Sequence, residues 1–201
     1  SSTNFSSGLQ KSNFFAMDTS IEFNIYGDAS LLKEAQNVLT DLESEVSVTD
    51  PDSEIYKINQ DGTGTLTGNA GNLMQEALEM CRRTDGALDI SVYPIVRAWG
   101  FTTEEYQVPE ETEIESLLPL VDYTKIQYDT ATGNVSIPKG MTIDLGSIAK
   151  GYGGQLAYLC FASCVLDLFA QHLCHSLCVS CAAPIYYFHD APPDFSFLIY
   201  L

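Results

Sequence analysis

Two patterns of apolar positions near the start of the chain predict a strand followed by a long helix. Ile21, Phe23 and Ile25 alternate with more polar neighbours, which is the two-residue period of a half-buried strand. Ser30 then precedes a run with the three- and four-residue spacing of an amphipathic helix, and we expect it to be the cap of that helix. The apolar positions of the run are Leu31, Ala35, Val38, Leu39, Leu42 and Val46.

The middle of the chain predicts two more helices and two strands. One helix runs from about Asn72 to Arg83, and its expected buried positions are Leu73, Ala77 and Met80. Another begins near Pro109, which is followed by acidic residues suited to a helix N-terminus. Strands are expected over 125–129 and 134–138. Because strands and helices do not alternate regularly, the predicted fold class is α+β with mixed sheets and packed helices.

Composition changes abruptly near residue 155. All nine Lys and Arg residues lie before residue 151, whereas residues 155–201 lack Gly, Lys, Arg, Glu, Thr, Asn and Met. Glycines for turns and long charged side chains for exposed faces are usual in a folded domain. We therefore expect three parts: a Ser-rich linker over 1–15, a domain over 16–154 and an atypical Cys/His-rich apolar tail over 155–201.

The tail holds five of the six cysteines and all three histidines. Cys178 and Cys181 have the Cys-x-x-Cys spacing of a metal-binding pair, with Cys174 and His175 nearby. No second ligand pair at structural-zinc spacing accompanies them, and several disulfide pairings are equally consistent with the sequence. A tail of foreign composition, such as a poorly folding terminus, is the simpler interpretation.

The charge balance narrows the range of partners. Nine basic and 27 acidic residues give a formal net charge of −18, which argues against binding to nucleic-acid backbones and to anionic lipid. No run reaches the roughly 18 apolar residues of a membrane-spanning helix. The chain opens with Ser1 and a Ser-rich stretch, which is consistent with a signal peptide or lipid anchor removed upstream.

Two segments carry candidate chemistry. The run Asp144–Tyr152 follows an apolar stretch and is expected to open a helix, so backbone N–H groups near Gly146 and Ser147, with Lys150 one turn later, would suit a diphosphate. An ordinary strand-to-helix turn remains the alternative. The segment 86–101 is rich in Gly, Pro and aromatic residues, and it either lines a pocket for a flat ligand or fills the core.

Four ordered blocks together resemble the FAD:protein FMN transferases, the ApbE-like flavin transferase family. Met17-Asp18-Thr19 is similar to the family's Met-Gly-Thr, and the stretch from Asp50 to Asn59 is similar to its Asp-Pro-x-Ser-Glu…Asn. Residues 86–101 match its Gly-Ala-Phe-Asp…Pro…Trp-Gly-Phe segment, and Asp144–Tyr152 matches Asp-Leu-Gly-Gly-Ile-Ala-Lys-Gly-Tyr. The resemblance covers about 140 residues and so only an N-terminal portion of the family's length.

The resemblance implies a function and a set of site residues. Such enzymes cleave FAD at its pyrophosphate and, with Mg²⁺, pass FMN to a Thr or Ser hydroxyl of a target protein, releasing AMP. The implied metal contact is the carbonyl of Ser147. The implied FAD contacts are Met17, Ala87, Leu88, Asp89, Asp144 and Lys150. Family members are typically exported and often lipid-anchored, so the expected location is periplasmic, or the extracytoplasmic face of a bacterial membrane.

Departures from the family pattern leave alternatives open. Thr49 and Gly154 stand where the family has an aromatic residue and an Asp, and the family's C-terminal metal ligands have no counterpart in 155–201. The sequence is therefore also compatible with a truncated, non-catalytic flavin-binding remnant, or with an FAD pyrophosphatase that releases FMN and AMP.

Overall fold

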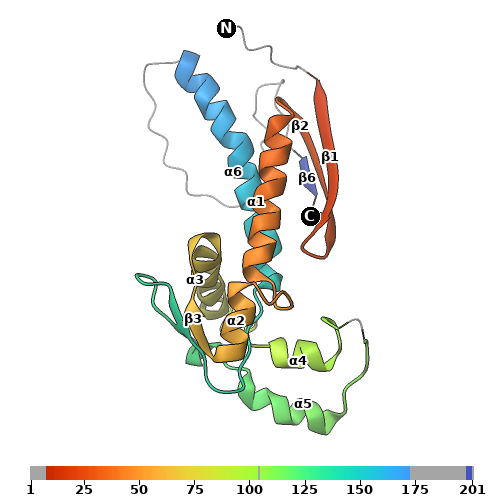
Figure 1. The fold of residues 1–201 in the computed structure, drawn as a ribbon, viewed down its shortest axis with the longest axis vertical. Helices are drawn as coiled ribbons and strands as arrows, with labels where there is room; N and C mark the ends of the chain where they lie inside the picture. The colour runs from red at the N-terminus through yellow and green to blue at the C-terminus, as the bar shows by residue number, and fades with distance from the viewer. Residues whose placement is uncertain (1–7, 104, 173–197, 201) are drawn as a thin grey trace. The chain divides into compact units, whose positions relative to one another are not determined.

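The computed structural model describes residues 8–103, 105–172 and 198–200. The chain divides into two compact units, one made of residues 1–41 and 150–201 and the other of residues 42–149. Each unit contains a small antiparallel sheet and helices, and Figure 1 shows these elements along the chain. The predicted α+β class with mixed small sheets and packed helices is confirmed.

The first unit is built on the sheet β1-β2-β6, formed by β1 (Leu9–Ala16), β2 (Thr19–Tyr26) and β6 (Leu198–Tyr200). Strand β2 has the predicted alternation, because Ile21, Phe23 and Ile25 are all buried. Figure 1 shows helices α1 (Ser30–Val46) and α6 (Gly146–His172) beside this sheet. Apolar faces of a sheet and two helices therefore form the core of this unit.

Strand β1 corrects the prediction of a linker over 1–15, because residues 9–15 pair with β2 over its whole length. In the sequence of β1, Leu9 is followed by four consecutive polar residues, 10–13, and Phe15 remains 72% exposed. Such a strand buries little apolar surface, so its own pattern resembles that of a polar linker. Its order comes from hydrogen bonds with β2, which the local composition does not reveal.

Helix α1 confirms the second predicted element. Leu32, Ala35, Leu39, Leu42 and Val46 are buried along one side of it. The predicted cap is wrong, because Ser30 is the first residue of the helix and donates its N–H to Oδ1 of Asp28 at 2.8 Å. This bond from the Ser30 backbone lowers the pKa of the Asp28 carboxyl.

Helix α6 begins at Gly146, where the sequence predicted a helix start, and continues without interruption through residue 155. Phe161 from this helix packs edge-on against Phe23 of β2, with ring centroids 5.5 Å apart. The change of composition at residue 155 therefore falls inside one helix. The predicted cysteine and histidine cluster at 174–181 lies outside the described residues.

The second unit contains the sheet β3-β5-β4, whose strands are β3 (Thr63–Thr65), β4 (Gln127–Tyr128) and β5 (Asn134–Ser136). Its helices are α2 (Glu54–Asp61), α3 (Gly68–Arg83), α4 (Tyr93–Ala98) and α5 (Glu111–Leu117), with the short 3₁₀ turns η1 (Leu118–Leu120) and η2 (Tyr123–Lys125). The predicted strands β4 and β5 are present but shorter than 125–129 and 134–138.

Helix α3 includes the predicted span 72–83 and starts four residues earlier, at Gly68. Leu73 and Ala77 are buried as expected, but Met80 is 40% exposed and Cys81 occupies the interior instead. Burial raises the pKa of the Cys81 thiol. The buried residues Leu73, Ala77 and Cys81 follow a four-residue repeat, whereas the prediction took a three-residue step from Ala77 to Met80.

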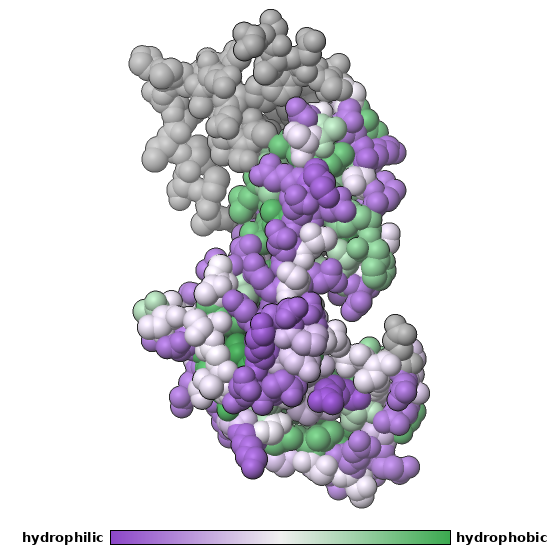
Figure 2. Space-filling view, viewed as in Figure 1, coloured by the Kyte–Doolittle hydropathy of each residue, from purple (hydrophilic) through white to green (hydrophobic). Residues whose placement is uncertain are grey.

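The surface of the described residues is mainly hydrophilic on the face that Figure 2 shows, with smaller hydrophobic groups between. Among the described helices, none combines the length and apolar character needed to cross a lipid bilayer.

Candidate functional site

Two of the sequence blocks meet through a single backbone hydrogen bond in the second unit. The N–H of Asp144 donates to the carbonyl of Ile90 at 2.8 Å. Ile90, Ile143 and Leu145 are each at most 1% exposed, so this junction is anchored in the core. The bond places Asp144 beside the loop that carries Ala87, Leu88 and Asp89, residues more than 50 positions earlier in the sequence.

The loop over residues 84–92 begins with a tight reversal at the end of α3. Asp85 and Gly86 both have positive φ, 54° and 79°, and the Gly86 N–H donates to the Cys81 carbonyl at 2.9 Å. Thr84 then fixes the next residues by accepting the Leu88 N–H on its Oγ1 at 3.1 Å. Ala87 is exposed by this arrangement, while Leu88 and Asp89 are half-buried.

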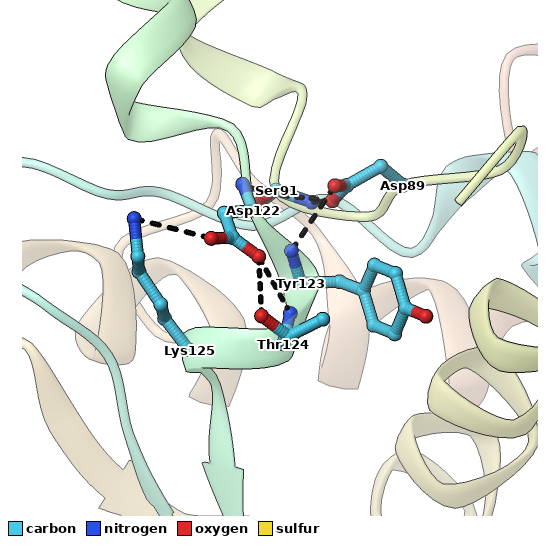
Figure 3. A network of polar contacts seen from close by, with 6 residues as sticks. All are labelled: Asp89, Ser91, Asp122, Tyr123, Thr124 and Lys125. Carbon is cyan, nitrogen blue, oxygen red and sulfur yellow. Dashed lines mark hydrogen bonds and ion pairs between the residues drawn. The ribbon is translucent and has the colours of Figure 1, made fainter. Parts of the chain in front are cut away.

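The Asp89 carboxylate organises this loop (Figure 3). Its Oδ1 accepts hydrogen bonds from the backbone N–H and the hydroxyl of Ser91, at 2.8 and 2.6 Å. Its Oδ2 accepts the backbone N–H of Tyr123 at 3.0 Å. Ser91 Oγ in turn accepts the Asp122 N–H at 2.8 Å. Asp89 and Ser91 therefore join the 84–92 loop to the start of η2.

The same network continues to the surface. Asp122 Oδ1 accepts the hydroxyl and the backbone N–H of Thr124, at 2.5 and 3.1 Å, and Oδ2 lies 3.1 Å from Lys125 Nζ. The Thr124 hydroxyl is the main cause of the lowered pKa of Asp122, with Lys125 contributing next. Because Asp122 and Lys125 are partly exposed, their ion pair adds little stability, and its effect is local ordering.

Asp144 also defines the start of helix α6. Its Oδ1 accepts the N–H of Gly146, the first residue of the helix, at 2.7 Å. Ser147 and Lys150 are both exposed, and Lys150 follows Gly146 by one helical turn on the same side. N–H groups of a first helical turn carry a partial positive charge. In α6 the Gly146 N–H is bonded to Asp144 Oδ1, and the Ile148 N–H is bonded to the Leu145 carbonyl at 3.0 Å. The partial positive charge of this helix start and the exposed Lys150 ammonium favour an anion, whereas the Asp144 carboxylate at the same place opposes one.

Met17 lies in the first unit, within the two-residue turn that connects β1 to β2. Met17 and Asp18 both have φ of 54°, and Ala16 pairs with Thr19 across the turn. These two positive φ values are those of a type I′ hairpin turn, which favours Gly and Asn. The Met17 side chain is 9% exposed.

The aromatic residues of segment 86–101 divide between the core and the surface. Tyr93 is 5% exposed and fills the core, as one of the two alternatives expected. Trp99 and Phe101 stay exposed by 37% and 59% and stack on each other, with ring centroids 6.3 Å apart. The segment is also more regular than a loop, since residues 93–98 form α4.

The sequence analysis did not identify Ser91 and Asn59 as site residues. Ser91 belongs to the Asp89 network, and Asn59 contacts Ile143 through both atoms of its amide. Asn59 ends the block that resembles Asp-Pro-x-Ser-Glu…Asn, and that membership was the one available signal. Long-range contacts of this kind, 84 residues apart, are not visible in a local pattern.

No cluster of metal ligands marks the predicted site residues. Within the described part of the chain, no three His, Cys, Asp or Glu side chains gather as they would around a metal ion. A cavity of about 380 Å³ in the second unit is lined by other residues, namely Gln75, Leu78, Glu79, Arg82, Tyr128 and Thr130.

Comparisons with known proteins agree with these motifs. Residues 17–181 match the model of the ApbE family. The FAD:protein FMN transferases of Vibrio cholerae and Haemophilus influenzae are 32% and 29% identical over 137 and 130 residues, which are 62% and 60% of this chain. The chain spans 38% of the length of each of these curated relatives.

Solved structures show the same fold. The ApbE protein of Thermotoga maritima superposes with a TM-score of 0.73 and 27% identity, covering 78% of this chain and 53% of that one. A flavin transferase ApbE variant from Vibrio cholerae gives a TM-score of 0.66 at 22% identity, covering 82% of this chain and 57% of that one. Since the family model matches most of its length, including all four sequence blocks, this chain belongs to the ApbE family.

Proposed function

We propose that this chain takes part in FAD:protein FMN transfer. In this reaction a Thr or Ser hydroxyl of a target protein attacks the phosphorus of the FMN half of FAD. A bond forms from the hydroxyl oxygen to phosphorus, the bridging P–O bond breaks, AMP leaves with the bridging oxygen, and the hydroxyl proton is released. The supporting observation is the Asp144–Ile90 hydrogen bond, which joins two of the blocks at the start of helix α6.

The start of helix α6 would hold the diphosphate of FAD. Partial positive charge at the helix N-terminus and the ammonium of Lys150 would offset the phosphate charge and the charge that develops during transfer. Asp144 keeps this turn in shape through its bond to Gly146. We assign its other carboxylate oxygen to a hydroxyl or base N–H of FAD.

The loop 84–92 would contact the rest of FAD. Ala87 is exposed and Leu88 half-buried, so both can meet a ligand without a change in the core. The Asp89 carboxylate already accepts hydrogen bonds from Ser91 and Tyr123, so we propose that Asp89 acts on FAD mainly by shaping this loop. A contact of Met17 with FAD remains a prediction from the resemblance.

The proposal includes Mg²⁺ because the sequence resemblance to the flavin transferase family implies it. Magnesium in phosphoryl-transfer sites is commonly held by one or two carboxylates, water and the substrate phosphates. Near the start of α6, the described residues contribute the Asp144 carboxylate and the Ser147 carbonyl, and Asp144 Oδ1 is already bonded to Gly146. These donors do not complete a metal site by themselves, and we derive no step through the ion.

The proposed partner is a protein with an acceptor Thr or Ser, on the extracytoplasmic side of a bacterial membrane, with a lipid anchor as the proposed membrane attachment. The test is incubation of the chain with FAD, Mg²⁺ and a library of Thr- and Ser-containing peptides, followed by mass spectrometry. Transfer predicts peptides heavier by FMN less water, with AMP released in equal amount. Free FMN and AMP without peptide labelling would indicate a pyrophosphatase, and neither product would indicate a non-catalytic chain. Either result would overturn the transfer proposal.

The same proposal predicts that the positive charge of Lys150 contributes to FAD affinity. Lys150→Ala should weaken FAD binding by about five- to tenfold, because a charge-assisted contact to phosphate is lost. Lys139→Ala removes another exposed lysine of the chain and should leave the affinity unchanged. Fluorescence titration with FAD at two salt concentrations measures both variants. Equal affinities for Lys150→Ala and the unaltered chain would remove Lys150 from the binding site.

A further inference from the structure

Asn59, in the last turn of α2, makes an unusual pair of contacts with Ile143. Its Nδ2 donates to the Ile143 carbonyl at 2.8 Å, and its Oδ1 accepts the Ile143 N–H at 2.7 Å. One side-chain amide thus satisfies both polar groups of one backbone residue. These are the two bonds that a neighbouring strand would supply in a sheet.

The segment that Asn59 holds is the one that leads into helix α6. Residues 141–145 form neither a helix nor a strand and belong to neither sheet. Met141, Ile143 and Leu145 are buried, so the polar backbone between them needs partners inside the protein. The partner of Ile143 is Asn59, and the partner of the Asp144 N–H is the Ile90 carbonyl, at 2.8 Å.

Asn59 therefore sets the position of the residue next to Asp144. A displacement of Ile143 would be carried into Asp144, whose Oδ1 bonds to Gly146 at the first residue of α6. Group transfer depends on such placement, because a misplacement of about 1 Å can lower a reaction rate about a hundredfold. The half-buried Asn59 amide bonds to Ile143, and Ile143 directly precedes Asp144, the proposed FAD contact.

The chemistry of the contact explains why an asparagine stands here. An amide can donate and accept at the same time in this geometry, whereas an ionised carboxylate can only accept and an aliphatic chain can do neither. A carboxylate at residue 59 would also face the Ile143 carbonyl oxygen without a proton between them. A protonated carboxylic acid, by contrast, has one donor and one acceptor and could restore both bonds.

We propose that Asn59 is a positioning residue for FAD: it fixes Ile143, and through it Asp144 and the start of α6, in the geometry that binds the FAD diphosphate. This inference rests on the proposed function, since it assumes that FAD binds at the start of α6. It goes beyond that function by assigning a role to a side chain that need not touch the ligand.

The experiment compares FAD affinity of the unaltered chain with Asn59→Leu, Asn59→Asp and a control, Asn72→Leu. Asn72 is exposed on α3, so its substitution makes the same chemical change without touching residue 143. Asn59→Leu should weaken FAD binding by about tenfold or more, and Asn72→Leu should leave it unchanged. Amide hydrogen exchange should become faster at Ile143 and Asp144 in Asn59→Leu, with protection in the core of α3 retained.

The pH profile of Asn59→Asp separates positioning from a general loss of stability. As pH falls from about 7.5 to about 5, the introduced carboxyl takes up a proton and regains its donor, since a partly buried carboxyl titrates above its usual range. FAD affinity of Asn59→Asp relative to the unaltered chain should then rise several-fold, while the ratio for Asn59→Leu stays flat. Asp144, Lys57 and Asp61 are present in every variant, so the ratio cancels their own response.

The outcomes distinguish the inference from the function on which it rests. If the unaltered chain does not bind FAD, the proposed function fails, and the exchange rates alone decide whether Asn59 holds Ile143 and Asp144. If the unaltered chain binds FAD but Asn59→Leu binds it equally well, Asn59 has no positioning role. A flat pH ratio for a folded Asn59→Asp would also overturn the proposal. If Asn59→Leu does not fold, the Asn59→Asp profile decides.

Discussion

The hydrogen bonds of the Asp89 carboxylate predict how substitutions of this single residue change the free energy of unfolding. It accepts three hydrogen bonds, from the Ser91 N–H, the Ser91 hydroxyl and the Tyr123 N–H. Asp89→Ala leaves these donors without their partner and should lower the free energy of unfolding by about 2–3 kcal/mol. Asp89→Asn, which keeps the shape but turns an N–H₂ group toward one donor, should cost about half as much. Urea denaturation measures both changes.

Asp61→Ala is the control for Asp89, because Asp61 is exposed at the end of α2. Its removal should change the free energy of unfolding by at most about 0.5 kcal/mol. If Asp89→Ala were as mild as Asp61→Ala, the network of Figure 3 would not order the loop.

Asp18 supplies a second prediction at this scale, and here a substitution should stabilise. Asp18 has a φ of 54°, in the left-handed region that costs an L-residue about 1–2 kcal/mol, somewhat less for Asp. Asp18→Gly should therefore raise the free energy of unfolding by about 0.5–1 kcal/mol, in line with the Gly of the Met-Gly-Thr pattern that this block resembles. Met17→Gly should not, because it also removes a buried side chain. A thermal melt in which Asp18→Gly lowers the midpoint would contradict the turn geometry.

At the scale of the element, the turn between β4 and β5 depends on one glycine. Gly133 has a φ of 75°, and a Cβ at this position would collide with the Leu66 carbonyl oxygen, which lies in backbone and cannot move aside. Gly133→Ala should therefore cost more than the conformational strain alone, about 3 kcal/mol or more. The Leu66 N–H, which donates to the Gly133 carbonyl at 2.9 Å, should lose its exchange protection.

Gly140 is the matched comparison, since its φ of 87° is equally unfavourable but a Cβ there meets only the end of the Leu120 side chain. Gly140→Ala should cost only the conformational strain, about 1–2 kcal/mol. Equal losses for the two variants in urea denaturation would show that the collision at Gly133 is relieved by small shifts.

The elements that the sequence predicted are those whose pattern comes from burial. Helices α1 and α3 and strand β2 each bury one face of a regular repeat, and all three are present. Helix α2 was missed because its eight residues bury only Ile55 and Ile58. Its start depends on Ser53, whose Oγ accepts the Ile55 N–H and donates to the Glu45 carbonyl. Such a cap depends on a tertiary contact.

In the candidate site, too, only the features with a local sequence pattern were predictable. The helix start after Asp144 follows from a local pattern of apolar residues and glycine, and α6 does begin at Gly146. The hydrogen bond between Asp144 and Ile90 could not be predicted, and neither could the contact of Asn59 with Ile143. Each joins segments that are distant in sequence. The role of Asp89 also came from the structure, since its carboxylate is turned toward Ser91 and Tyr123.

At the scale of the whole molecule, the acidic character of the chain constrains how FAD could bind. The net charge of −18 opposes any anion, so a diphosphate needs local compensation. The start of α6 and Lys150 are the groups that we propose for it. Added salt screens the general repulsion as well as the Lys150 attraction, so the difference between the unaltered chain and Lys150→Ala should shrink as salt rises.

Saturable binding of FAD tests the central claim most directly. The measurement is calorimetric and fluorescence titration of the chain with FAD, with and without Mg²⁺, and with AMP and FMN as separate ligands. The account predicts one-to-one binding of FAD, with a dissociation constant within about 1 μM to 1 mM and affinity that depends on Lys150. A flavin signal that rises linearly without saturation, in both the presence and the absence of Mg²⁺, would contradict it.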